Sequence, residues 1–154
     1  MKSEYKKVTF TFGKIEAGWL DLYVNCDSKK LKVRTSAVYD PYEEIKCWFE
    51  KIIKNEFPAQ ITIDEEGRYK SFKIESVTDV LLKYSIYDEE NCNGEFLVNT
   101  IINKKELVGN YYHSFKAFVI NEYDPDEWEF DLDGNNLKTI DFTNIEKYLF
   151  NSQI

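Results

Sequence analysis

The residues best suited to chemistry are carboxylates that gather near the end of the chain. Residues 121–154 carry nine acidic and two basic side chains, which accounts for −7 of the net charge of −8. Closely spaced carboxylates suit a divalent-metal site, a docking surface for a cationic partner, or a solvated face that keeps the protein in solution. Seven of them fall within twelve positions with no base between them: Glu122, Asp124, Asp126, Glu127, Glu129, Asp131 and Asp133.

The metal hypothesis depends on Glu129, Asp131 and Asp133, whose spacing is similar to the start of an EF-hand loop. That loop requires a bidentate glutamate at its twelfth position, which here falls on Ile140. A true EF-hand is therefore excluded. A weaker Ca²⁺ or Mg²⁺ site, in a metal-binding protein or a metal-dependent enzyme, stays as the alternative.

The docking hypothesis adds two aromatic residues to the same segment. Tyr123 and Trp128 are predicted to be exposed anchors inside an acidic rim, an arrangement that occurs in protein interfaces. A rim of this sign attracts a basic protein and speeds its association. The predicted binding residues are Tyr123, Asp124, Asp126, Glu127, Trp128, Glu129, Asp131 and Asp133.

Residues typical of enzymes do not assemble in the sequence. The single histidine, His113, falls opposite the apolar stripe of its predicted helix, away from any buried dyad. The three cysteines, Cys26, Cys47 and Cys92, form no CxxC pair, and Cys47 and Cys92 lie among carboxylates that disfavour a thiolate. The six glycines make neither a dinucleotide fingerprint nor a P-loop. The sequence therefore predicts no catalytic residue and no cofactor.

Composition narrows the class of protein further. The lysines and arginines are scattered through an acidic chain, which argues against nucleic acid as a partner. No apolar run reaches the length of a membrane span, and the charged N-terminus is unlike a signal peptide. Three widely spaced cysteines suit a reducing compartment. We expect a cytoplasmic protein, and the oligomeric state stays open.

The 154 residues fit one domain, 1–154. Alternating apolar residues predict strands within 8–12, 19–37, 61–86 and 96–102. A helix is predicted from Asp40–Pro41 to about Asn55, and a second from about Lys104 to Asn121 with Asn103 as its cap.

The last segment is predicted to begin with a strand, because Trp128, Phe130 and Leu132 alternate with acids. Residues 137–142 are predicted to return as another strand. A short final helix should follow, opened by a capping box of Thr143 and Glu146. The string Tyr-Asp-Pro-x-Glu occurs at Tyr39 and Tyr123, and is expected to open a helix at the first site and a strand at the second.

The predicted fold is α+β: an antiparallel sheet of about six to eight strands, two amphipathic helices packed on one face, and a short C-terminal helix. The favoured function is a protein-binding module, an acidic inhibitor or immunity-type protein that docks a basic partner such as a nuclease toxin. At the level of class, a small acidic α+β chain resembles many bacterial toxin-immunity proteins, although no motif in it identifies a family.

Overall fold

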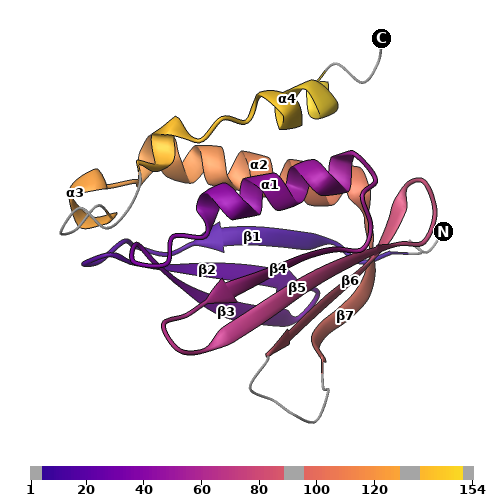
Figure 1. Ribbon diagram of the computed structural model, residues 1–154, viewed down its shortest axis with the longest axis horizontal. Coiled ribbons are helices and arrows are strands. Elements are labelled where there is room, and N and C mark those ends of the chain that lie inside the picture. Colours follow the sequence, from indigo (N-terminus) through magenta and orange to yellow (C-terminus); the bar gives the residue numbers. More distant parts are fainter. Residues whose placement is uncertain (1–4, 89–95, 129–135, 151–154) are drawn as a thin grey trace.

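The computed structural model describes residues 5–88, 96–128 and 136–150, and places seven strands in two antiparallel sheets (Figure 1). The first sheet has the order β1-β2-β3: β1 (Val8–Phe12), β2 (Trp19–Cys26) and β3 (Lys29–Ser36). The second has the order β4-β5-β6-β7: β4 (Ala59–Asp64), β5 (Tyr69–Ser76), β6 (Leu81–Asp88) and β7 (Phe96–Asn103). The α+β class is confirmed, and the single predicted sheet is wrong.

The alternation in the sequence sets which side of each strand is buried. In β2 the residues Leu20, Leu22 and Val24 are buried, and the intervening residues are half-exposed. Leu22 lies opposite Val33 of β3, so both strands turn the same kind of face to the core. The period of two therefore predicted β2 and β3 and their buried faces correctly.

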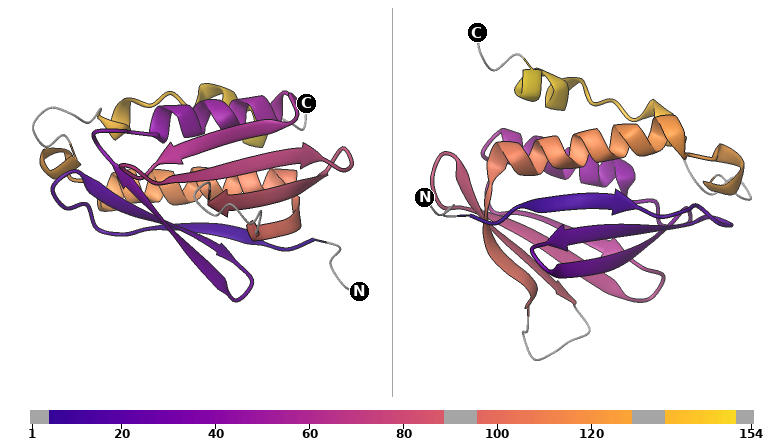
Figure 2. Two further views of the ribbon diagram at one scale, coloured as in Figure 1. Left: turned by 60° about the horizontal axis from the view of Figure 1, so that its bottom comes forward. Right: turned by 180° about the vertical axis from the view of Figure 1, so that it is seen from behind.

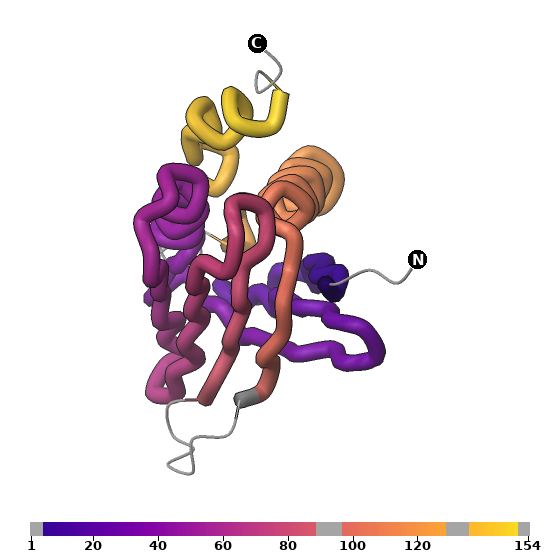
Figure 3. The backbone as a smooth tube through the Cα atoms, turned by 90° about the vertical axis from the view of Figure 1, so that its right-hand side faces the viewer, coloured from indigo at the N-terminus to yellow at the C-terminus, as the bar shows by residue number. Residues whose placement is uncertain are grey.

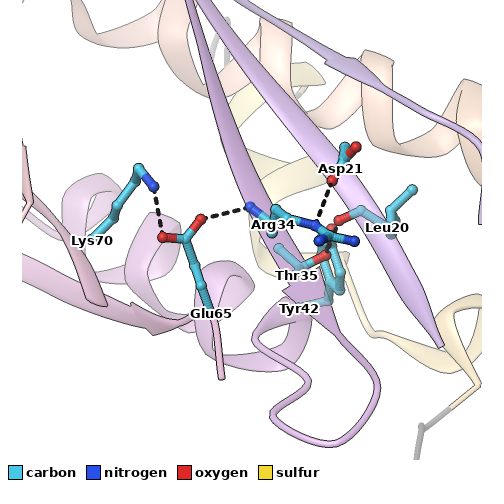
Figure 4. Close-up of polar contacts among 7 residues, drawn as sticks. All are labelled: Leu20, Asp21, Arg34, Thr35, Tyr42, Glu65 and Lys70. Atoms are coloured by element: carbon cyan, nitrogen blue, oxygen red, sulfur yellow. Dashed lines mark hydrogen bonds and ion pairs between the residues drawn. The ribbon is translucent and has the colours of Figure 1, made fainter. Parts of the chain in front are cut away.

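The sheets meet at two margins, and neither margin forms a full strand ladder. At one, the backbone N–H of Lys6 donates to the carbonyl of Ile101 at 2.7 Å. At the other, the N–H of Arg34 donates to Glu65 Oε2 at 2.8 Å, and Lys70 Nζ lies 2.6 Å from Glu65 Oε1 (Figure 4). After β3 the chain enters a helix and not a neighbouring strand, so the second sheet starts separately. The two sheets contribute buried residues to one core.

Two long helices cover the same side of the sheets (Figures 1 and 2). They are α1 (Tyr42–Ile53) and α2 (Lys104–Asn121), close to the predicted bounds. Asn103 Oδ1 accepts a hydrogen bond from the N–H of Glu106 at 3.0 Å, which confirms the predicted cap. Their aromatic rings meet in the core, where Phe49 stacks on Tyr111 with ring centroids 4.7 Å apart.

The C-terminal segment differs most from the prediction. Residues 125–128 form a helical turn, α3 (Pro125–Trp128), so the predicted strand does not begin at Trp128, and its residues 129–133 lie outside the described residues. Residues 137–139 form a 3₁₀ turn, so the strand predicted at 137–142 is wrong. The cause is local: Asp124 Oδ1 accepts from the N–H of Asp126 at 3.1 Å, and the carbonyl of Asp124 accepts from the N–H of Trp128 at 3.0 Å. These bonds close a helical turn directly after the proline.

The final helix, α4 (Thr143–Phe150), is confirmed and forms a third layer on α1 and α2 (Figure 3). Its predicted capping box is wrong. Asp141 Oδ1 accepts from the N–H of Thr143 at 2.9 Å, while Glu146 accepts a hydrogen bond from the hydroxyl of Tyr112 on α2. Within the described ranges, no helix has both the length and the apolar character needed to cross a bilayer.

Candidate binding surface

Trp128, predicted as an exposed anchor, is a core residue with 0% of its surface exposed. Its ring meets that of Tyr42 edge-on, with centroids 5.6 Å apart. The Thr35 hydroxyl donates to the carbonyl of Leu20 at 2.7 Å, so the Tyr42 hydroxyl must donate to Thr35 Oγ1, 2.7 Å away (Figure 4). Burial raises the pKa of Tyr42 far above its ordinary value, which keeps that proton in place. Trp128 is therefore part of the core, where it packs against Tyr42.

Tyr123, the second predicted anchor, is also buried. It is 9% exposed, and its hydroxyl oxygen accepts a hydrogen bond from the N–H of Leu137 at 3.1 Å. The side chain holds the 3₁₀ turn against α2 instead of facing a partner. Both aromatic anchors predicted from the sequence are therefore wrong, because Tyr and Trp are as suited to core packing as to recognition.

The carboxylates of this segment fall into two groups. Glu122, Asp124 and Asp126 are exposed, and none forms an ion pair with a base in the part of the chain that the structure describes. Glu127 is used internally: its Oε2 accepts from the N–H of Ala17 at 2.8 Å and its backbone carbonyl from Gly18 at 2.7 Å. The predicted residues Glu129, Asp131 and Asp133 lie outside the described residues.

A groove of about 390 Å³ lies between the β3–α1 connection and β4, and the sequence analysis missed it. Three carboxylates line it, Asp40, Glu44 and Asp64, and no lysine or arginine is among its lining residues. Val38 and Tyr39 also line it and are 55% and 50% exposed. Exposed apolar side chains beside carboxylates are the composition that the sequence predicts for residues 123–133.

The two Tyr-Asp-Pro strings form similar turns but place their tyrosines differently. Each aspartate accepts a hydrogen bond from the N–H two residues later, Asp40 from Tyr42 at 2.9 Å and Asp124 from Asp126 at 3.1 Å. Both strings therefore open a helix, and the predicted strand opening at the second is wrong. The turns are alike, but the first leaves Tyr39 half-exposed and the second buries Tyr123.

The groove and the exposed acids of residues 122–126 belong to one end of the molecule. Gly18 links them, since its carbonyl accepts from the N–H of Ala37 at 2.8 Å and its N–H donates to the carbonyl of Glu127 at 2.7 Å. Figure 1 shows α3 at this end, beside the β1–β2 connection. We call this surface the acidic end and define it by Asp40, Glu44, Asp64, Glu122, Asp124 and Asp126.

Among the residues that the structure describes, the histidine and the two cysteines lie apart from one another. His113 is exposed and lies against the ring of Phe150, at a centroid distance of 6.1 Å. Burial raises the pKa of the Cys26 thiol, which opposes formation of a thiolate, and Cys47 is exposed on α1. Cys92 lies outside the described residues. Across residues 5–88, 96–128 and 136–150, no three His, Cys, Asp or Glu side chains converge on a potential metal position.

Comparison with known proteins adds no assignment to this geometry. No protein-family model matches the chain, and no curated protein and no solved structure matches it either. The function therefore has to be inferred from the charge, exposure and shape of the acidic end.

Proposed function

We propose that the protein is a binding module that docks a basic protein at its acidic end, as acidic inhibitors and immunity-type proteins do. The observation that supports this most directly is the groove. It combines three carboxylates with two exposed apolar side chains, and no base lines it.

The two kinds of side chain would contribute differently to binding. The carboxylates attract a cationic partner over distances near a Debye length, about 8–10 Å at ordinary ionic strength, and so raise the association rate. The groove has room for a lysine or arginine side chain, whose charged head would lie among Asp40, Glu44 and Asp64. Tyr39 would supply the buried aromatic contact that holds the complex together.

The test compares two double variants with the same change in net charge. Tyr39→Ala with Glu44→Lys alters the groove. Val80→Ala with Glu56→Lys is the control, because Glu56 and Val80 are also exposed and lie outside the groove. Each protein is immobilised and used to capture basic proteins from native lysate at low salt, and each captured protein is then purified and titrated against all three forms.

We expect a basic protein that binds the wild type and the control alike, with affinity that falls as salt is raised. The groove variant should bind at least about 100-fold more weakly, the combined loss of one aromatic hot spot and one reversed charge. The proposal fails if no captured protein distinguishes the groove variant from the control, or if the affinity is indifferent to salt.

A further inference from the structure

The outer edge of β1 carries backbone groups that point away from the first sheet. The N–H of Gly13 donates to the carbonyl of Asp21 at 2.8 Å, so the odd-numbered residues of β1 pair with β2. The N–H and C=O groups of Val8, Phe10 and Phe12 must then face the other edge. The bond from Lys6 to Ile101 of β7 leaves from this same edge and agrees with the assignment.

Beyond Lys6, β7 and β1 separate, and the edge is left largely unpaired. Within the described ranges, the one hydrogen bond to the outward groups of β1 comes from Asn110 Nδ2, which donates to the carbonyl of Val8 at 2.8 Å. Exposed strand edges of this kind readily pair with another strand. β1 contains no proline, bulge or charged residue that would prevent such pairing.

A groove of about 270 Å³ lies between α2 and residues Phe10 to Phe12 of β1. On the helix side its lining includes the small residues Ser114 and Ala117, together with Asn121 and Glu122, and Glu122 also belongs to the acidic end. The helix runs alongside the strand in the same direction, since Asn110 contacts Val8 and Phe118 stacks on Phe12 with centroids 4.9 Å apart. The groove therefore lies beside a strand edge whose outward backbone groups, apart from the Val8 carbonyl, have no hydrogen-bond partner among the described residues.

The segment Val8–Phe12 is complementary to itself in antiparallel register. Centred on Phe10, a second copy would place Phe10 opposite its equivalent, Thr9 opposite Thr11, and Val8 opposite Phe12. Each of these pairs joins like with like, and Thr–Thr and apolar pairs across strands are stabilising. The central residue and both flanking apolar residues present their backbone groups outward, so the pairing would form six hydrogen bonds, about two for each facing pair. Two of the six would go to the Val8 carbonyls, whose second lone pair is left available by the bond from Asn110.

We infer that two copies of this chain associate through the outer edges of β1, which joins their three-stranded sheets into one continuous sheet. The two α2 helices would then lie antiparallel across the symmetry axis. The small side chains of Ser114 and Ala117 would let them approach to about 8 Å, the closest separation usual for packed helices. A symmetric two-fold interface of this kind is the commonest way in which identical chains assemble.

Charge predicts how this dimer responds to salt. Each copy has a net charge of −8, so the two copies repel each other, and screening should favour association. The complex with a basic partner should respond in the opposite direction. The two interactions are therefore distinguishable in one set of titrations, and failure of one leaves the other standing.

The test measures sedimentation of the full chain over a wide range of protein and salt concentration. Ala117→Arg should abolish the dimer, because the long side chain fills the groove, while Val80→Arg, which adds the same charge at an exposed position outside the groove, should leave it intact. Hydrogen exchange at the Phe10 and Phe12 amides should slow at least about tenfold as the dimer forms. Circular dichroism checks that both variants are folded.

Three results would overturn the inference. The wild type could sediment as a monomer under all conditions. A dimer could form and persist in Ala117→Arg, which would place the contact elsewhere. The Phe10 and Phe12 amides could also be equally protected in dilute monomer and dimer, which would show that the edge is covered within a single chain.

Discussion

Replacing Trp128 with alanine separates the structural role of this residue from the exposed role predicted by its sequence pattern. A buried tryptophan removes roughly 150–250 Å² from water, which at about 25 cal/mol per Å² is worth about 4–6 kcal/mol. Alanine retains part of that burial and the surroundings relax, so the measured loss for such truncations is about 3–5 kcal/mol. Because Trp128 is 0% exposed, we expect Trp128→Ala to lower the free energy of unfolding by about that amount.

The neighbours of Trp128 make a loss at the upper end more reasonable than one at the lower. Its ring packs edge-on against Tyr42, whose hydroxyl belongs to the buried hydrogen-bond chain through Thr35 to Leu20. A cavity here would loosen three polar groups as well as the apolar contact. Trp128→Phe keeps a ring in the site and should give an intermediate loss.

Urea titration followed by far-UV circular dichroism measures the free energy of unfolding, and thermal unfolding followed by the same signal gives the melting temperature. The melting temperature should fall by roughly 6–20 °C, at about 2–4 °C per kcal/mol for a domain of this size. Asp126→Ala is the matched control, since Asp126 is exposed in the same short helix and should change stability by less than about 0.5 kcal/mol. A loss below about 1 kcal/mol in Trp128→Ala would refute the placement of this ring in the core.

Three other buried groups give measurable expectations. Glu65→Ala should destabilise the fold by about 3 kcal/mol, because it leaves Lys70, whose side chain is 13% exposed, without its carboxylate; adding Lys70→Met should restore part of this loss in urea titrations. Burial, and then a hydrogen bond to a neighbouring carboxylate, raise the pKa of Tyr112 from 10.0 to about 12. The stability that this group contributes should therefore be retained below pH 10 and fall as the pH rises towards 12. Tyr112→Phe should flatten this decline. Burial raises the pKa of Cys26, so a maleimide should modify the exposed Cys47 in the native protein and reach Cys26 only after unfolding, as peptide mass spectrometry can show.

The parts of the fold that follow from local patterns were predictable from the sequence. The apolar stripes of α1 and α2 lie within single stretches of chain, and the cap at Asn103 forms as expected. The cap predicted for α1 is wrong by one residue, because α1 begins at Tyr42 with Pro41 in the capping position. Strand alternation likewise identified the buried faces of β1 and β2. Alternation carries no information about which strands pair, so the division into two sheets, with Lys6 and Glu65 at the margins, was not accessible.

The negative charge of the acidic end was predictable from the sequence, but its exposed apolar residues were not. Clustered charges identified exposed acids at Asp124 and Asp126, because few residues could pair with them locally. The aromatic anchors were misassigned, since the same Tyr-Asp-Pro turn exposes Tyr39 and buries Tyr123. What distinguishes the two tyrosines is a long-range contact, the N–H of Leu137, and no local pattern encodes that contact.

Positive and negative net charge are separated along the chain, and the negative part contains the acidic end. Residues 1–36 carry eight basic and four acidic side chains, a net charge of +4, and the remaining chain carries twelve and twenty-four, a net charge of −12. In β3 the exposed bases Lys30 and Lys32 precede Ser36, after which the chain enters the acidic end. Opposite net charges on different parts of one fold make an electric dipole. The field of this dipole orients an approaching basic protein relative to the fold before the two make contact. A basic partner would therefore be oriented towards the groove and repelled from the outer face of the first sheet, which is what a single specific docking site requires.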